Sequence, residues 1–537
     1  MASLPDKKII VALRMISSHE LTWLAIILIG LFFTYYQSLS NSFLYWDDYF
    51  QVTQITKSDQ LNSADLKHIF TIQSNVIGMY QPLTTLFFYL EKNILKVSWS
   101  THHTISLLWH CLNVLLVYYL TKLISKNKLQ ALIVSALFAF SPINTEAIVW
   151  ISARSTLISS SFLLFSAICY WHFLNSDKKR LFYLLSLTTF ILALLAKAPA
   201  VILVPILLIM DYLTTRKITN SLVRLLPFFS IAIIFVAIAV FVRSTSHVIP
   251  RDLPDYNLFQ LFTINLASVS FYFQRIITPL QPLALEPYPS LLRHMLPFSQ
   301  YVYAFITIIA SVVIIFISKK SRLVTIVGLV YLLSLLVFAK WDHSSTPFIA
   351  DRYLYLPALA IFYGFAIAVR LLIKRWPQIT IALGCYLILL AFLSNITSAY
   401  WQNDLSYWDY IIGRHPDFAL AYSNRAWTHT INKNYKSALD DYYQCNKLDS
   451  ENSFCLLNSS TILLDVYQQA QQALALAQRA SQLDPLSDAP YYRLALTKQA
   501  LGDRNEALVN IRRALAINDS NLDYQALLQN LIKLPIN

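Results

Sequence analysis

The sequence predicts an all-α membrane protein in which a bundle of about eleven transmembrane helices precedes a solenoid of helical repeats. Hydrophobic residues make up 56% of the 537-residue chain and charged residues only 13%, so a soluble fold would expose too much apolar surface. Many apolar runs reach the length of about 18 residues that is needed to cross a membrane. From about residue 401 onward the composition changes abruptly to a polar, helical and repetitive pattern.

Basic residues set the predicted orientation of the spans. The net charge is +13, and the basic residues cluster between apolar runs, which is the positive-inside pattern and not a nucleic-acid signature. The clusters alternate from loop to loop, which predicts a cytoplasmic N-terminus and an extracytoplasmic C-terminus. The first apolar run has no small-residue cleavage site at its end, which predicts an uncleaved first span. The predicted spans lie near residues 21–39, 103–121, 129–146, 150–173, 181–197, 199–213, 223–242, 299–317, 323–340, 353–369 and 378–398.

One further apolar stretch, residues 258–282, does not fit this alternation. If it crossed the membrane, every later basic cluster would move to the opposite side. The stretch also carries Gln274 and Arg275 and ends in a Pro-rich segment. We therefore interpret it as an interfacial or re-entrant helix pair on the outer side.

The region after Trp401 contains three similar segments. Ala438-Leu439 recurs as Ala473-Leu474 and Ala507-Leu508, a period of 34 to 35 residues that is typical of tetratricopeptide repeats. Such repeats present a concave surface for a protein or peptide, the alternative being a dock that packs on the membrane part. The predicted domains are a membrane domain at 1–400 with an outer loop at 40–102, and a repeat domain at 401–537 with repeats near 419–452, 454–487 and 488–521 and a capping helix at 522–534.

The five cysteines show no metal-ligand spacing, and three of them lie in predicted spans. Cys445 and Cys455, in the repeat region, could pair in an oxidising compartment. Free thiols are the expected state of this pair.

Two adjacent carboxylates, Asp47 and Asp48, directly follow the first span. Neighbouring residues cannot share a helix face, so the two side chains are expected to do different jobs. One could act as a general base toward a hydroxyl acceptor, and the other could orient that acceptor or bind a divalent cation. The alternative is the solvated start of a loop.

Polar residues within spans are costly and therefore indicate function. In span two, His103, Ser106, His110 and Asn113 form one helical stripe, for which interhelical hydrogen bonding is slightly favoured over ligand contact.

Charged residues recur at the outer ends of later spans. Glu146 and Arg154 follow each other at a helical spacing and could either pair or bracket a polar headgroup. Lys197 interrupts two apolar runs, and Asp351-Arg352 opens span ten, where a cation would suit a lipid phosphate.

Taken together, these motifs resemble the transmembrane and tetratricopeptide repeat-containing (TMTC) family, of the GT-C glycosyltransferase class. Their order and spacing over nearly the whole chain carry the resemblance. The matching pieces are Trp46-Asp47-Asp48, Tyr80-Gln81-Pro82-Leu83, His110-Cys111-Leu112-Asn113, Pro142-Ile143-Asn144-Thr145-Glu146-Ala147 with Arg154, Leu195-Ala196-Lys197, Asp351-Arg352-Tyr353-Leu354-Tyr355-Leu356-Pro357, and Asn424-Arg425-Ala426 after Trp401.

The resemblance implies a GT-C bundle whose outer loop bears the catalytic acid, Asp47 or Asp48. It implies a donor sugar, mannose in the best-known members, on a polyprenyl phosphate, and an acceptor Ser or Thr hydroxyl on a protein outside the cytoplasm. No cofactor is certain, and the acidic pair could bind a divalent cation. The substrate-binding residues would be Tyr80, Gln81, His110, Asn113, Glu146, Arg154, Lys197, Asp351 and Arg352.

The chain departs from the family at three positions. The family usually has Arg where this chain has Gln81, often His at Asn144, and an acidic residue at Ala198. These departures could reflect a different donor or a reduced activity.

Two other classes of protein fit parts of the sequence. A non-catalytic, membrane-anchored repeat scaffold for envelope assembly would keep its function without the two carboxylates. A transporter is disfavoured because the chain has only seven glycines and no inverted repeat. Composition favours a bacterial inner membrane, with the repeats in the periplasm; in a eukaryote the location would be the ER membrane, with the repeats in the lumen.

Overall fold

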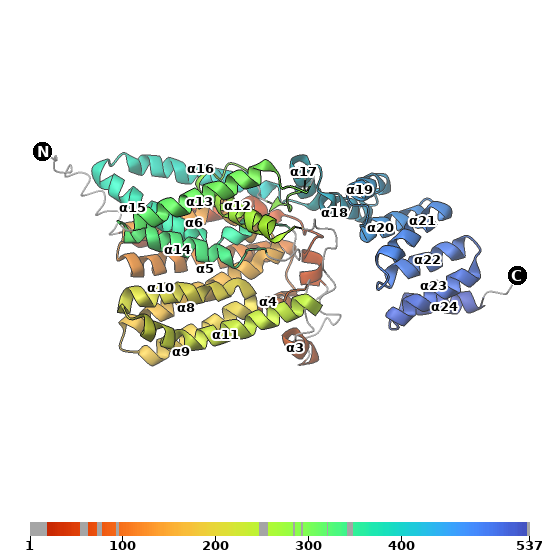
Figure 1. Ribbon diagram of the computed structural model, residues 1–537, viewed down its shortest axis with the longest axis horizontal. Helices are drawn as coiled ribbons and strands as arrows, with labels where there is room; N and C mark the ends of the chain where they lie inside the picture. Colours follow the sequence, from red (N-terminus) through yellow and green to blue (C-terminus); the bar gives the residue numbers. More distant parts are fainter. Residues whose placement is uncertain are drawn as a thin grey trace. The chain divides into compact units, whose positions relative to one another are not determined.

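The computed structural model divides the chain into two compact units, residues Met1–Asn403 and Asp404–Asn537 (Figure 1). It describes residues 19–53, 63–71, 78–92, 96–245, 256–282, 285–291, 294–318, 320–340 and 347–533. Parts of the predicted outer loop, Lys319 of a basic cluster and residue 534 of the predicted capping helix lie outside these ranges. Each unit is described by itself.

The first unit is a bundle of long helices, with one short sheet among the described residues. Leu285–Glu286 (β1) pairs antiparallel with Ile349–Ala350 (β2). The helices are α2 (Glu20–Tyr35), α3 (Ser63–Phe70), α4 (Pro82–Leu90), α5 (Trp99–Ser125), α6 (Lys128–Phe140), α7 (Thr145–Val149), α8 (Arg154–Asn175), α9 (Lys179–Ala196), α10 (Leu203–Thr215), α11 (Ile218–Thr245), α12 (Leu258–Ile277), α13 (Phe298–Ser318), α14 (Arg322–Leu336), α15 (Ala358–Arg375) and α16 (Ile379–Ala399), with short 3-10 or π turns η1 (Tyr36–Ser40), η2 (Tyr49–Thr53), η4 (Pro142–Asn144), η5 (Ile151–Ala153), η6 (Ala198–Ile202) and η7 (Asp351–Leu354).

Within the described residues, eight helices are long and apolar enough to cross a membrane, and a bent pair raises the number to nine. The helix α14 is apolar but shorter. Each predicted span overlaps a helix or, for the third, a bent pair of helices, although α14 and α15 are not among the eight. The predicted all-α bundle is confirmed, and these helices indicate a multi-pass membrane protein.

The apolar stretch at 258–282 forms one continuous helix, α12, rather than the expected pair. Asn257 and Gln260 form a reciprocal capping box, which satisfies backbone N–H groups of the first turn and fixes the start of the helix at Leu258. α12 is not among the described helices that pass the test for a membrane span. It packs along α13, and the Tyr331 hydroxyl of α14 donates to the Val269 carbonyl, 3.0 Å away.

The third predicted span is broken. α6 ends at Phe140, and the segment Pro142–Val149 turns away from it by 56°. Pro142 has no N–H to donate and fixes its own φ, which ends α6 and starts the η4 turn. A second turn, η5, then precedes α8. These breaks lie in the buried interior and change side-chain directions where the polar residues gather.

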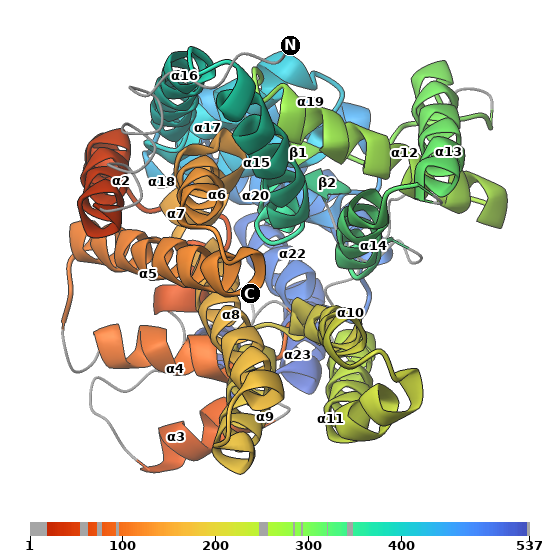
Figure 2. The same ribbon diagram turned by 90° about the vertical axis from the view of Figure 1, so that its left-hand side faces the viewer.

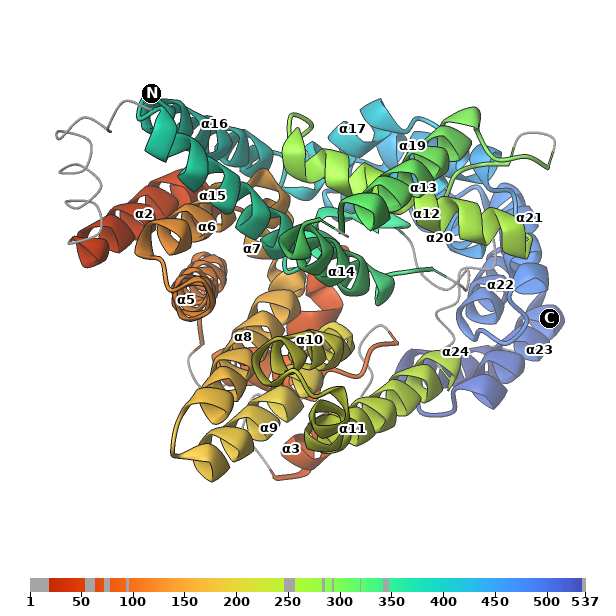
Figure 3. The same ribbon diagram turned by 60° about the vertical axis from the view of Figure 1, so that its left-hand side comes forward.

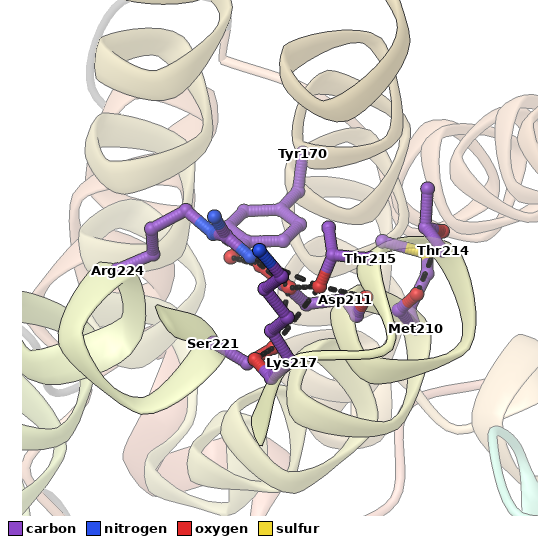
Figure 4. A network of polar contacts seen from close by, with 8 residues as sticks. All are labelled: Tyr170, Met210, Asp211, Thr214, Thr215, Lys217, Ser221 and Arg224. Atoms are coloured by element: carbon purple, nitrogen blue, oxygen red, sulfur yellow. Dashed lines mark hydrogen bonds and ion pairs between the residues drawn. The ribbon is translucent and has the colours of Figure 1, made fainter. Parts of the chain in front are cut away.

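Figures 2 and 3 show α8, α9, α10 and α11 as neighbours on one side of the bundle, where they share a buried apolar core. A network of hydrogen bonds connects α8, α10 and α11 near the ends of α8 and α10 (Figure 4). Asp211 accepts hydrogen bonds from Tyr170 of α8 (2.6 Å) and from Ser221 (2.6 Å) and Arg224 (2.5 and 2.8 Å) of α11. Its oxygens are therefore satisfied inside the protein.

The second unit consists of α17 (Asp404–Arg414), three antiparallel helix pairs and a last helix. Small residues (Ala438, Ala473, Ala477 and Ala507) are fully buried where the helices cross, because alanine allows a close approach. The pairs are α18 (Ala419–Ile431) with α19 (Tyr435–Leu448), α20 (Ser453–Asp465) with α21 (Ala470–Leu483), and α22 (Ala489–Ala500) with α23 (Arg504–Ile517), followed by α24 (Leu522–Lys533).

The expectation of free thiols in this unit is wrong. Cys445 near the end of α19 and Cys455 at the start of α20 form a disulfide. The turn between the helices brings their Cα atoms to 6.5 Å, which lies within the range that a disulfide can bridge. The other three cysteines, Cys111, Cys169 and Cys385, are free.

Candidate functional site

The acidic pair lies in the turn after the first span, and the two carboxylates have different surroundings. Asp48 is buried, with 1% of its surface exposed. One of its oxygens accepts from the Leu44 backbone N–H at 3.2 Å, and the other accepts from both the backbone N–H (2.8 Å) and the hydroxyl of Ser152. Asp48 therefore fastens the acidic turn to the break before α8.

Asp47 is half-buried, and among the described residues its carboxylate has no hydrogen-bond partner. Burial raises the pKa of Asp47 to about 7, Arg352 opposes this shift, and the neighbouring Asp48 adds to it. Burial also raises the pKa of Asp48, to about 6, against the hydrogen bonds from Ser152 and Leu44. Both carboxylates thus have a raised pKa, and Asp47 is the one whose oxygens are available to exchange a proton, because those of Asp48 accept hydrogen bonds.

Arg352 and Glu146 meet beside Asp47. The Arg352 guanidinium forms an ion pair with Glu146, whose other oxygen accepts from the Arg352 backbone N–H at 2.8 Å. The guanidinium also lies over the rings of Trp150 and Tyr353, 5.1 and 5.0 Å from their centroids. The predicted site residues Asp47, Glu146 and Arg352 thus come together.

Two lysines extend this cationic region. The Lys197 ammonium donates to the Thr156 hydroxyl at 2.6 Å, and with Arg352 and Tyr353 it lines a narrow cavity of about 30 Å³. Lys340, which the sequence did not single out, lies over the Tyr353 ring at 5.1 Å. Asn265 of α12 holds the Lys340 backbone in both directions, each hydrogen bond being 2.8 Å long.

Arg154 does not pair with Glu146. The break at Trp150 and η5 removes the shared helix face that the spacing predicted. Instead, the fully buried Arg154 donates to Glu91 (2.5 Å), to the Ser106 hydroxyl (2.9 Å) and to the His102 carbonyl (2.6 Å). The same Glu91 oxygen contacts His102 Nδ1 at 2.7 Å. Arg154 is therefore occupied within the bundle and does not bracket a headgroup in this structure.

His110 and Asn113 connect helices, as the favoured interpretation of the polar stripe predicted. Both contact the Tyr355 hydroxyl, His110 Nδ1 at 2.7 Å and the Asn113 amide at 3.0 Å. Asn113 also donates to the Leu157 carbonyl and accepts from the Ser161 hydroxyl. The two residues thereby hold the segment that carries Arg352.

Asp351 also has a partner that the sequence analysis did not assign to it. Arg275 of α12 binds it with two parallel hydrogen bonds, of 3.0 and 2.6 Å, and both side chains are buried. Asp351 therefore fastens α12 to the turn before α15, whereas its neighbour Arg352 points to Glu146.

Tyr80 and Gln81 lie apart from these contacts. The Tyr80 hydroxyl donates to the Phe70 carbonyl at 3.1 Å, and Gln81 is buried at the start of α4. Within the described residues, neither side chain hydrogen-bonds to the acidic pair or to Arg352.

An aromatic stack borders the acidic turn. Trp46 stacks on Trp150 with ring centroids 4.8 Å apart, and Trp150 stacks on Trp401 at 5.8 Å. The Asn41 amide donates to the Trp401 carbonyl, and the Ser42 backbone N–H donates to the Gln402 carbonyl. The end of the first unit is thereby fastened to the loop that carries Asp47.

Several of these residues were not found from the sequence. Ser152 and Asn265 are common residue types without a distinctive spacing, and Lys340 resembles an ordinary residue at the end of a span. Arg275 carried a signal, since a charged residue in an apolar stretch needs a partner. Among the described residues, no group of three or more His, Cys, Asp or Glu side chains is placed to hold a metal ion.

Comparisons with known proteins agree with the motifs. A human protein named protein O-mannosyl-transferase TMTC3 is 31% identical over 114 residues, which cover 21% of this chain and 12% of that protein. A Caenorhabditis elegans protein, named protein O-mannosyl-transferase F38B6.6, is 29% identical over 172 residues, or 31% of this chain and 24% of that protein. The resemblance to the TMTC family is confirmed. The chain matches less than a quarter of the length of these relatives, and no protein-family model matches it.

Solved structures with tetratricopeptide repeats also match. The Arabidopsis OM64 TPR domain is 20% identical and covers 22% of this chain and 96% of its own, with a TM-score of 0.21. Yeast Tom70 is 13% identical and covers 78% of this chain and 95% of its own, with a TM-score of 0.23. Scores this low carry no argument about this TMTC-like chain.

Proposed function

We propose that this chain is a GT-C-type membrane glycosyltransferase that transfers a sugar, mannose in the first instance, from a polyprenyl phosphate to Ser or Thr hydroxyls of a protein. One observation carries the proposal: a carboxylate that titrates near neutral pH, Asp47, lies beside a cluster of cations at one end of the bundle. The names of the TMTC relatives support the type of reaction.

Asp47 is the general base of this proposal. It takes the proton of the acceptor hydroxyl while that oxygen attacks C1 of the sugar, a role for which a pKa of about 7 is well matched. Asp48 cannot do the same without losing its bonds to Ser152 and Leu44, so it acts as a positioning residue. A single displacement inverts the anomeric centre.

The cations bind the leaving phosphate. As the bond between C1 and the phosphate oxygen breaks, negative charge grows on the departing polyprenyl phosphate, and preorganised cations stabilise it. Arg352 and Lys340 supply positive charge, which the Glu146 carboxylate partly offsets, and the Lys197 amine lies beside them as a further hydrogen-bond donor. Glu146 orients the guanidinium and keeps it beside Trp150, so a donor phosphate meets a fixed cation.

The residues do not favour a resident divalent cation. Both oxygens of Asp48 already accept hydrogen bonds, so the acidic pair offers one available carboxylate, that of Asp47. A divalent cation on one protein carboxylate would depend on the substrate for most of its ligands. We therefore assign no step of the reaction to a metal.

The repeat unit is the proposed acceptor-binding domain, and we place it outside the cytoplasm, in the periplasm or the ER lumen. The disulfide between Cys445 and Cys455 supports this side of the membrane, because structural disulfides persist in oxidising compartments. Stacked helix pairs present an extended surface that suits an unfolded segment of polypeptide.

The test is transfer by the full chain, purified and reconstituted in lipid, from radiolabelled mannosyl phosphoryl polyprenol to a Ser/Thr-rich polypeptide. We expect Asp47→Asn to reduce the rate by about 10²- to 10⁴-fold, as the loss of a general base does. A matched control is Asp177→Asn, which changes an exposed carboxylate between two helices. Full transfer by Asp47→Asn and by Asp48→Asn would exclude the mechanism and favour the non-catalytic scaffold.

A further inference from the structure

A second cavity lies within the bundle, away from the acidic pair. Its volume is about 970 Å³, at the upper end of the range for ligand sites. Aliphatic side chains of six helices, α5, α6, α8, α10, α14 and α15, form most of its wall. Figure 3 shows these helices bordering one region of the first unit.

One end of this cavity is basic. Lys122, Lys126 and Lys128 line it where α5 turns into α6, the end of these helices opposite to Glu146 and Arg154. Glu20 contacts two of them, 2.9 Å from Lys122 and 3.6 Å from Lys128. Three lysines therefore lie at this end of the cavity. No carboxylate is found among the described lining residues of the cavity.

We propose that this cavity binds an anionic phospholipid from the leaflet on the side of the basic clusters. The acyl chains occupy the aliphatic space, and the headgroup phosphate meets the three lysines. Basic pockets between transmembrane helices suit anionic headgroups, because the charges attract while the chains stay in apolar surroundings. Trp171, which also lines the cavity, suits the interface between headgroups and chains.

This cavity borders the narrow cavity of the proposed donor site. Leu163 and Leu356 line both this cavity and the narrow one that contains Lys197 and Arg352. A polyprenyl chain of the donor is therefore the rival occupant. The three lysines favour the phospholipid over the polyprenyl chain, because the phospholipid headgroup is anionic and the polyprenyl tail carries no charge. This inference does not rest on the proposed glycosyltransferase activity.

The test is photolabelling of the full chain in phosphatidylcholine vesicles that contain a trace of photoreactive phosphatidylglycerol. Lys126→Gln and Lys128→Gln are each expected to lower labelling about five-fold, the effect of one lysine near an anionic headgroup. The double variant Lys178→Gln/Lys179→Gln is the matched control, because it removes two exposed lysines at the start of α9 that do not line the cavity.

A second variant separates the lysines from the cavity itself. Val330→Trp places a large side chain in the cavity and leaves the lysines intact, so we expect it to lower labelling and to keep the protein folded and monodisperse. Crosslinked peptides should come from α10 and α14. The proposal is overturned if labelling is equal in all variants, if the crosslinks lie outside the lining, or if polyprenyl phosphate displaces the phosphatidylglycerol probe.

Discussion

The bundle contains two arginine–glutamate pairs near the acidic turn, and they differ in what else each arginine can reach. Arg154 is completely buried, with 0% of its side chain exposed, and its Nε and both terminal nitrogens donate to protein acceptors. Arg352 keeps 12% of its side chain exposed, binds Glu146 and presents its face to Trp150 and Tyr353. The first pair closes a network, and the second borders a cavity.

The difference shows why a charge within a span does not by itself identify a binding residue. A fully buried guanidinium whose three nitrogens all donate to the protein can contribute to folding and to the position of its neighbours, but it presents no exposed surface to a ligand. Arg352 lies with Lys197 and Lys340 around Tyr353, so three basic side chains gather at the second pair, where the Arg352 side chain is partly exposed. An anion would therefore be bound at the second pair and not at the first.

The largest expected effect comes from breaking the first pair, Arg154 with Glu91. Arg154→Gln leaves Glu91 buried without its main cation, so we expect a loss of about 3–5 kcal/mol in the free energy of unfolding. Thermal unfolding and the yield of monodisperse protein in detergent would measure it. Glu91→Gln combined with Arg154→Gln should recover part of the loss. An unchanged unfolding midpoint with abolished transfer would instead place Arg154 at the substrate.

The same substitution in the second pair, Arg352 with Glu146, should lower the rate of transfer and not the stability. Arg352→Gln retains a side chain that can hydrogen-bond to Glu146 but removes the positive charge, so we expect transfer to fall by about 10²- to 10³-fold. The unfolding midpoint should move much less than in Arg154→Gln. Rates measured per folded molecule would test this, and equal losses of stability in the two variants would end the distinction between the pairs.

Much of the fold could be predicted because its signals are local and repeated. Runs of apolar residues and alternating basic clusters located the helices of the bundle, and Ala438, Ala473 and Ala507 marked the repeats. The broken third span could not be predicted, because Pro142 shows where a helix ends but not the direction the chain then takes. That direction decided the partners of Glu146 and Arg154.

The site was predictable in its residue types but not in its pairing. Asp47, Asp48, Lys197 and Arg352 were found because charges at the ends of spans are costly. Whether Asp48 or Asp47 is available depends on Ser152, a residue more than a hundred positions away whose identity gives no warning. In the same way, a bond to Arg275 turns Asp351 into a structural residue.

The pH dependence of transfer would sharpen the role of Arg352. Asp47 acts as a base in its ionised form and has a pKa of about 7, so the rate should rise about tenfold per pH unit below that value and level off above it. Arg352 opposes the rise in this pKa, so Arg352→Gln should move the midpoint to higher pH. Rates of the two proteins over the same buffers measure the shift. A profile without a midpoint, or one that Arg352→Gln leaves unmoved, would separate Asp47 from the reaction.

The smallest expected effect concerns the support of the second pair by α12. Asn265 holds the Lys340 backbone with two hydrogen bonds, and Lys340 lies over the same tyrosine as Arg352. Asn265→Ala removes both bonds and leaves the Lys340 backbone less ordered without removing its charge, so we expect transfer to fall by a few-fold, about 1 kcal/mol in total. The change should appear in the Michaelis constant for the donor, because the phosphate would meet a less ordered cation. A matched control is Asn458→Ala, whose amide donates to a carbonyl in its own helix in the repeat unit. If Asn265→Ala leaves the Michaelis constant for the donor unchanged, Lys340 does not contribute to donor binding. The donor phosphate would then be bound by Arg352 and Lys197 without it.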